Sequence, residues 1–161
     1  MNPLIIIPAR MASTRLPGKP LADIHGKPMI VHVMNRAQEA AIGPVHVACA
    51  ETEILSAVVS SGGHAVMTPP DLPSGTDRVR VAADAIDPDK RHDIIINVQG
   101  DMPALNPELI AQVTALMNTH PDCDIATAVV ETESEREKSD PNVVKAVITE
   151  SGRALYFTRA H

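Results

Sequence analysis

The sequence predicts an α/β fold in which helices flank a mostly parallel β-sheet. Apolar runs typical of strands alternate with segments typical of helices through the first 130 residues. Two of these runs, residues 4–7 (LIII) and 93–98 (DIIINV), are nearly continuous in apolar residues, as expected for strands buried on both faces. The chain has 161 residues, 44% of them hydrophobic, which is enough for one domain with a substantial core.

Proline, glycine and capping residues set the predicted ends of the helices. Pro8 ends the first strand, Pro28 starts the first helix, and Gly43 ends that helix. Thr52 and Asn106 stand where helix N-caps are expected, because their side-chain oxygens can accept from the first free N–H groups. The helices predicted in this way span residues 29–41, 52–61, 77–86 and 107–118.

The predicted strands lie between these helices and continue after them. The acidic segment 131–140 separates two of the later strands, and we expect it to be a solvated loop or a short exposed helix. Residues 9–28 are rich in proline and glycine and are expected to be mostly loop. The strands span residues 4–7, 45–48, 65–67, 93–98, 125–130 and 143–149, and another begins at 154–157.

The composition excludes several classes of protein. With Tyr156 and Phe157 as its two aromatic residues, the chain lacks the rings on which many modules stack nucleic-acid bases, and the net charge of −6 disfavours nucleic-acid binding further. Cys49 and Cys123 do not make a disulfide scaffold and fit a reducing compartment. No run approaches the roughly 20 apolar residues that span a bilayer, and no signal peptide is recognisable. We therefore expect a soluble cytoplasmic protein.

Positive charge is concentrated in the loop that follows the first strand. Residues 1–36 hold five Lys/Arg and one acid, whereas the rest of the chain holds nine Lys/Arg and nineteen acids. Arg10, Arg15 and Lys19 follow the strand directly, at the sheet edge where parallel sheets bind ligands, and such cations bind phosphate oxygens. Small residues such as Ala9 and Ser13 let the backbone approach an anion closely. The loop is either a polyphosphate site or a solvated basic loop, and it matches neither the Walker nor the GxGxxG pattern.

The amino-acid sequence of this loop carries more information than its charge. Residues 7–30, IPARMASTRLPGKPLADIHGKPMI, resemble the N-terminal signature of the 3-deoxy-manno-octulosonate (KDO) cytidylyltransferases, also called CMP-KDO synthetases. The resemblance implies a Rossmann-like fold of the nucleotide-diphospho-sugar transferase type, and the transfer of CMP from CTP to KDO for lipopolysaccharide synthesis. It further implies that Arg10, Ser13, Arg15 and Lys19 contact the triphosphate of CTP, and that Arg10 and Lys19 stabilise the departing pyrophosphate.

A second candidate segment, NVQGDMP at residues 97–103, follows the strand at 93–98. A carboxylate at this place, facing a polyphosphate, is well placed to hold Mg²⁺, which binds one or two carboxylates together with phosphate oxygens and water. The alternative is that Asp101 only caps a turn. The segment is similar to the family's QGDEP wording, which implies that Asp101 is a catalytic Mg²⁺ ligand and that Gln99 contacts the nucleotide or the sugar. Met102 departs from that wording.

A third segment, PDLPSGTDR at residues 70–78, is similar to the family's HxSGTxR motif, which borders the cytidine pocket. Leu72 replaces the usual histidine. The residues alone also indicate a loop followed by a helix with Thr76 as its N-cap, and both interpretations can hold at once. The resemblance implies that the matching residues bind substrate; these are Ser74, Gly75, Thr76 and Arg78.

Two further segments resemble the family. Residues 154–160, ALYFTRA, are similar to its ALYFSRA wording, which makes Arg159 either a contact to the acidic sugar or an ordinary surface arginine. Residues 47–51, VACAE, occupy the place of a VATDxE-like strand end. Ala50 stands where the family has Asp, and no function is assigned there.

The resemblance also bears on domain organisation. We expect a single nucleotide-binding domain over residues 1–161, truncated relative to the family, with part of the sugar-binding and dimer-forming portion absent. Such a chain is expected to bind CTP without full synthetase activity. The full-length enzyme is expected to be a homodimer that binds neither nucleic acid nor a membrane. The alternatives are a cytidylyltransferase for a related acidic sugar, such as 8-amino-KDO or sialic acid, and an inactive nucleotide-binding fragment.

Overall fold

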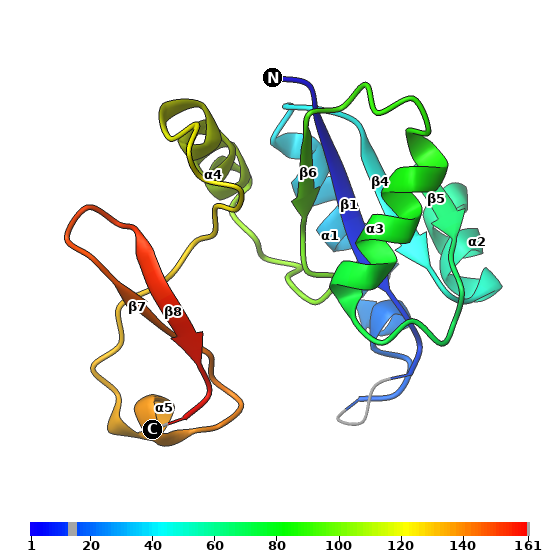
Figure 1. Cartoon of the computed structure of the whole chain (residues 1–161). Helices are drawn as coiled ribbons and strands as arrows, with labels where there is room; N and C mark the ends of the chain where they lie inside the picture. The colour runs from blue at the N-terminus through cyan, green and yellow to red at the C-terminus, as the bar shows by residue number, and fades with distance from the viewer. Residues whose placement is uncertain (13–15, 161) are drawn as a thin grey trace. The chain divides into compact units, whose positions relative to one another are not determined.

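Four parallel strands form the central sheet of the structure, a computed structural model that describes residues 1–12 and 16–160 (Figure 1). The sheet has the order β5-β4-β1-β6. Its neighbouring strands pair in parallel throughout, which confirms the predicted α/β fold with a mostly parallel sheet. The strands are β1 (Pro3–Ala9), β4 (Val45–Cys49), β5 (His64–Met67) and β6 (Ile94–Asn97).

Strand β1 is buried on both of its faces, as its apolar run predicts. Ile5 and Ile7 pack into one hydrophobic cluster, and Leu4 and Ile6 pack into another, because successive side chains of a strand point to opposite faces. Burying each of these side chains fully contributes roughly 1.5–3 kcal/mol. Helices on each side of the sheet complete these clusters. The first cluster includes side chains from α1 (Met29–Glu39), α2 (Thr52–Ser60) and α4 (Pro107–Thr119), and the second includes side chains from α3 (Gly75–Ile86).

Strand β6 is less buried than its sequence predicts. Its residues alternate between half-buried and exposed, and the side chain of Ile95 is 42% exposed. The prediction of a strand buried on both faces is wrong here because, within the described residues, β6 pairs with β1 alone and forms the edge of the sheet.

The helices lie where the sequence predicts them, but two of their caps differ. Asn106 caps α4 as predicted, since its side chain accepts from the N–H of Glu108 at 3.1 Å. Helix α3 begins earlier than predicted, so its N-cap is Ser74, whose hydroxyl oxygen accepts from the N–H of Asp77 at 3.1 Å. The prediction of Thr76 as the cap is therefore wrong. Thr52 is the first residue of α2 rather than its cap.

A short hairpin and a 3₁₀ turn interrupt the region expected to be loop. Strands β2 (Asp23–Ile24) and β3 (Lys27–Pro28) pair in antiparallel fashion, and a 3₁₀ helix spans Lys19–Leu21. Two residues join the strands, and both have positive φ, 51° at His25 and 81° at Gly26. This is the backbone twist that two-residue hairpin loops require.

The described residues group in two compact units, Met1–Ala126 and the part of the chain from Thr127 onward, where the sequence predicts one domain over 1–161. The second unit contains α5 (Glu135–Ser139) and an antiparallel pair of strands, β7 (Lys145–Ile148) and β8 (Ala154–Thr158). These confirm the predicted last strands and a short exposed helix in the acidic segment.

The strand predicted at residues 125–130 is not formed. Residues 125–134 belong to no helix or strand, and the side chain of Val130 is 89% exposed. The alternation of apolar and small residues suits a strand locally, but a strand needs a neighbour to satisfy its backbone, and none pairs with this segment in the described structure.

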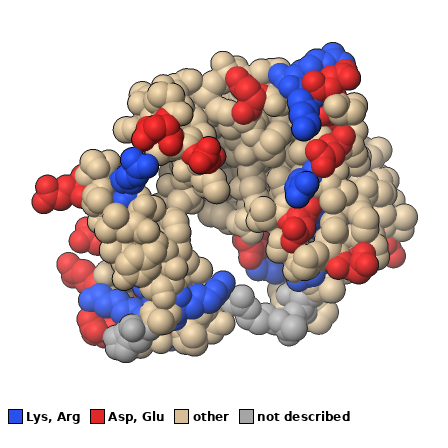
Figure 2. Space-filling view, in the orientation of Figure 1, with Lys and Arg blue, Asp and Glu red and all other residues tan. Residues whose placement is uncertain are grey.

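No helix in the described parts of the chain is long and apolar enough to cross a membrane. On the face of the molecule drawn in Figure 2, acidic side chains lie among the basic ones.

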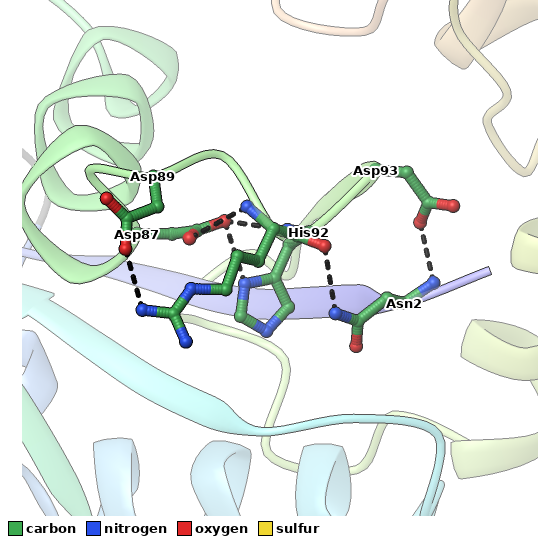
Figure 3. Close-up of polar contacts among 6 residues, drawn as sticks. Asn2, Asp87, Asp89, His92 and Asp93 are labelled. Carbon is green, nitrogen blue, oxygen red and sulfur yellow. Dashed lines mark hydrogen bonds and ion pairs between the residues drawn. The ribbon is translucent and has the colours of Figure 1, made fainter.

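The turn between α3 and β6 is held by the carboxylate of Asp87 (Figure 3). This buried carboxylate accepts from the backbone N–H groups of His92, at 2.7 Å, and Arg91, at 2.9 Å, and lies 2.9 Å from Nδ1 of His92. These hydrogen bonds, the one from the His92 backbone first, lower the pKa of Asp87 from 3.8 to about 2. Asn2 joins the same turn, because its backbone N–H donates to Asp93 and its side-chain amide donates to the Arg91 carbonyl.

Asp87→Asn is expected to lower the melting temperature at pH 7, because the amide replaces a charged acceptor of two N–H groups. The folded-state pKa of Asp87 lies below its ordinary value, so the carboxylate stabilises the fold above about pH 4 and loses this contribution as the pH falls towards 2. Thermal denaturation followed by circular dichroism from pH 7 to pH 3 should show the gap to the unsubstituted chain narrowing below pH 4. Asp89→Asn, which removes an exposed ion pair with Arg91, is the control and should change little. A gap that does not depend on pH contradicts this account of Asp87.

Candidate functional site

Two adjoining pockets lie at the carboxyl ends of β1 and β6, the neighbouring strands whose loops the sequence analysis singles out. We name them the Ser74 pocket and the Asp101 pocket. The pockets share part of their walls, which makes them two compartments of one site; the shared residues are Pro8, Ala9, Arg10 and Gln99. The Ser74 pocket adds Ser74, Gly75 and Arg78, and the Asp101 pocket adds Lys19, Pro20, Met29, Gly100 and Asp101.

A close approach at Gly100 brings the loop after β6 against the end of β1. A Cβ atom at this position would lie 2.5 Å from the carbonyl oxygen of Pro8, which is closer than a real Cβ contact allows. The N–H of Val98 donates to the Ile6 carbonyl at 3.1 Å, so the two strands remain paired up to this point. Glycine is therefore needed at residue 100 for Asp101 to lie beside the basic loop.

Lys19 and Asp101 meet across the Asp101 pocket. The Nζ atom of Lys19 donates to Oδ2 of Asp101 at 2.8 Å, although 82 residues separate them in the sequence. Both side chains remain open to solvent, with 35% and 53% of their surface exposed. An exposed ion pair of this kind is worth only about 0–1 kcal/mol, so both charged groups remain available to a ligand.

Arg78 forms a buried wall of the Ser74 pocket. Its residue surface is 2% exposed, and its guanidinium donates to the Thr68 hydroxyl and to the carbonyls of Pro69, at 3.0 Å, and Pro70, at 3.4 Å. The Thr68 hydroxyl in turn donates to the Cys49 carbonyl at 3.0 Å. These acceptors satisfy the buried guanidinium, which would otherwise be costly to remove from water.

Neighbouring charges act on Arg78 as well. Burial lowers the pKa of Arg78, the Glu51 carboxylate raises it, and the positive charge of Arg10 lowers it. Arg10 and Arg78 both line the Ser74 pocket, so an anion bound there would offset their positive charges. This is the electrostatic character expected of a phosphate or carboxylate site.

The structure brings together most of the site residues that the sequence predicts. Thr76 is exposed and lines neither pocket. Ser13 and Arg15 lie outside the described residues. Arg159 belongs to the second unit, where its guanidinium donates to the carbonyls of Pro141 and Asn142. The predicted residues that line the two pockets are Ala9, Arg10, Lys19, Ser74, Gly75, Arg78, Gln99 and Asp101.

Two residues that contact the site residues without lining the pockets could not be identified from the sequence. Thr68 holds the Arg78 guanidinium, and Glu51 accepts a hydrogen bond from the basic loop. The three departures from the family wording, Ala50, Leu72 and Met102, line neither pocket. Within the described residues, no group of three or more His, Cys, Asp and Glu side chains is arranged to hold a metal ion by itself.

Comparisons with known proteins show what this chain is similar to. A cytidylyltransferase family model matches residues 4–161. Curated 3-deoxy-manno-octulosonate cytidylyltransferases from Paramagnetospirillum magneticum and Rhodospirillum rubrum are 55% and 56% identical over 99% and 98% of this chain. The solved structure of a CMP:2-keto-3-deoxy-manno-octonic acid synthetase complexed with CTP is 40% identical over 99% of the chain, with a TM-score of 0.85. The chain spans about two thirds of the length of these proteins: 67%, 65% and 65% respectively.

A more distant structure shares the fold. A cytidylyltransferase from Leptospira borgpetersenii is 22% identical over 74% of this chain, which covers 50% of that protein, with a TM-score of 0.62.

Proposed function

Since this chain belongs to the 3-deoxy-manno-octulosonate cytidylyltransferase family, we propose that its two pockets bind CTP and promote the transfer of CMP to KDO. The products are CMP-KDO, an activated sugar for lipopolysaccharide synthesis, and pyrophosphate. The observation that carries the proposal is the meeting of Arg10, Lys19 and Asp101 around one pocket at the carboxyl ends of β1 and β6. A structural relative that matches 99% of this chain was solved in complex with CTP.

In the proposed reaction, the anomeric hydroxyl of KDO attacks the α-phosphorus of CTP in line. A new P–O bond forms, the hydroxyl proton passes to solvent, the bond from the α-phosphorus to the oxygen that bridges it to the β-phosphorus breaks, and pyrophosphate leaves. In such a transfer the protein forms no covalent bond to the substrate. It accelerates the reaction mainly by positioning the reactants and by neutralising the charge of the phosphates. Arg10 and Lys19 hold phosphate oxygens and offset the negative charge that builds up on the pyrophosphate.

Asp101 is the residue of this chain that fits a magnesium ion. Its carboxylate borders the same pocket as two phosphate-binding cations, and it is exposed enough to exchange Lys19 for another cation. One carboxylate completed by phosphate oxygens and water is a ligand set that Mg²⁺ accepts, so a site without further acidic residues fits. Bound there, Mg²⁺ would polarise the α-phosphate.

The Ser74 pocket is the proposed place of the nucleoside or the acidic sugar, beside Ser74, Gly75, Arg78 and Gln99. Arg10 and Arg78 line this pocket and are suited to binding a carboxylate or phosphate group. The small residues Ser74 and Gly75 leave room for the ring of a base or a sugar. Four further assignments rest on the family resemblance alone and stay predictions. They are CTP contacts at Ser13, Arg15 and Thr76, and a sugar contact at Arg159. The homodimer and the cytoplasmic location of the protein likewise stay predictions.

The test of this function is pyrophosphate release by the purified protein with CTP, Mg²⁺ and one candidate sugar acid at a time. KDO is expected to give the fastest release, ahead of 8-amino-KDO and sialic acid, although this chain is expected to remain below full synthetase activity. Faster release with either of the other sugars would assign the site to that sugar. Binding of CTP without release for any sugar would favour a nucleotide-binding protein without transferase activity.

Arg10→Ala and Lys19→Ala are each expected to weaken CTP binding by about 10- to 100-fold, because hydrogen bonds between charged groups are worth about 1.5–3 kcal/mol. Lys27→Ala is the matched control, since Lys27 belongs to the same basic region but lies exposed in β3 and lines neither pocket. Isothermal titration calorimetry measures all three variants. Equal affinities for Arg10→Ala and Lys27→Ala would remove Arg10 from the phosphate site.

A further inference from the structure

Glu51 links the basic loop after β1 to the end of the neighbouring strand β4. Its Oε2 atom accepts from the backbone N–H of Met11 at 3.0 Å, across 40 residues of sequence. The carbonyl of Met11 accepts from the N–H of Gly18 at 3.1 Å. Met11 is therefore held through both of its backbone polar groups, and we call this arrangement the Met11 clamp.

The Met11 clamp lies next to both cations of the Asp101 pocket. Arg10 precedes Met11 in the sequence and Lys19 follows Gly18, so each cation is attached to a backbone position that the clamp fixes. The side chain of Met11 adds to the anchorage, because it is partly buried against the main hydrophobic cluster. Rotating the Met11 peptide would turn the neighbouring Arg10 backbone with it. The hydrogen bond to Glu51 opposes that rotation.

The place of Glu51 in its own helix points to the same role. Glu51 is the N-cap residue of α2, with the extended backbone typical of a cap (φ −123°, ψ 146°), yet its side chain makes no capping hydrogen bond. Ser, Thr, Asp or Asn at this position would stabilise the helix by about 0.5–2 kcal/mol. The Glu51 carboxylate does not provide this stabilisation and is directed to Met11 instead.

Glu51 lies behind the site rather than in its walls. Its side chain is half-buried. Glu51 itself lines neither pocket. It is therefore placed to support the binding groups without touching a ligand.

We propose that Glu51 is a positioning residue that accepts the Met11 N–H and so sets the backbone from which Arg10 and Lys19 reach the phosphates of the nucleotide. This inference rests on the proposed function, because it takes the ligand to be CTP. It assigns the role to the hydrogen-bond acceptor of Glu51 rather than to its negative charge. A glutamine, which keeps an acceptor oxygen of the same reach, should therefore replace it.

The test compares Glu51→Ala with Glu51→Gln, and uses Glu53→Ala as the control in the same helical turn. Glu53 is exposed and contacts the Thr52 hydroxyl rather than the loop. In calorimetric titrations, Glu51→Ala is expected to bind CTP about 3- to 10-fold more weakly, the value of one hydrogen bond. Glu51→Gln and Glu53→Ala should bind within twofold of the unsubstituted chain. Unchanged CTP affinity in Glu51→Ala would overturn the proposal, and so would an equal loss in Glu51→Gln.

A second measurement keeps this inference separate from the proposed function. Hydrogen exchange of the Met11 amide, followed by NMR without nucleotide, should be slow in the unsubstituted chain and in Glu51→Gln, and fast in Glu51→Ala. Similar protection in all three proteins would show that Glu51 does not hold the loop. If the unsubstituted chain bound no CTP while the Met11 amide behaved as expected, the proposed function would fail and the clamp would stand.

Discussion

Asp101→Asn is expected to lower the rate of CMP-KDO formation by about 100-fold or more, while CTP affinity without metal changes by less than tenfold. The amide keeps the shape of the side chain but removes the negative charge that fits Mg²⁺, and electrostatic groups of this kind typically contribute 10²–10³ in rate, or roughly 3–4 kcal/mol. Pyrophosphate release at saturating CTP measures the rate. Calorimetry with and without Mg²⁺ measures the affinity, and the tightening caused by Mg²⁺ should disappear in this variant.

The control for Asp101→Asn is Asp84→Asn, an exposed carboxylate on α3 that lines neither pocket. It should retain both turnover and the effect of Mg²⁺. Near-normal turnover of Asp101→Asn in Mg²⁺ would exclude Asp101 as the metal ligand and leave its ion pair with Lys19 as its role.

Gly100→Ala is expected to lower both stability and CTP binding, in spite of adding a single methyl group. The new Cβ would meet the Pro8 carbonyl oxygen at 2.5 Å, and this oxygen belongs to the backbone rather than to a flexible side chain that could move aside. Overpacking of this kind costs about 1–3 kcal/mol. Displacing Asp101 from the end of β1 by about 1 Å can lower turnover by about 100-fold. Thermal denaturation, CTP titration and pyrophosphate release together measure these effects.

Gly62→Ala separates this steric effect from ordinary backbone strain. Gly62 has φ +79°, which disfavours any side chain, but a Cβ there would have nothing within 4 Å. This variant should lose some stability and keep its CTP affinity. If Gly100→Ala also kept full CTP affinity, the close approach of the two loops would not be needed for the site.

The sequence predicts the central part of the fold because its signals there are local. The apolar run of residues 4–7 requires burial on both faces, and these four residues are fully buried in β1. Whether β6 lies at the edge of the sheet depends on which strands pair with it, and strand pairing is a property of the whole chain. The exposure of Ile95 and the missing strand at residues 125–130 are therefore not visible in local sequence.

The candidate site shows the same division. Arg10, Lys19 and Asp101 could be predicted because their loops follow the two most apolar runs and resemble the family's motifs. The structure then pairs those two strands and brings the opposite charges of Lys19 and Asp101 together. Glu51 could not be predicted as part of the site, since its role depends on a side chain reaching 40 residues back to Met11. The sequence also predicts Thr52 rather than Glu51 as the N-cap of this helix, so the unusual capping residue was not visible before the structure.

CTP is expected to bind in the two adjoining pockets at the carboxyl ends of β1 and β6. NMR chemical-shift mapping of a CTP titration, on this 161-residue chain, tests it most directly. The largest shifts are expected at the backbone amides of Ala9, Arg10, Gly75, Gln99 and Asp101. Shifts concentrated away from these loops, or none at saturating CTP, would contradict it.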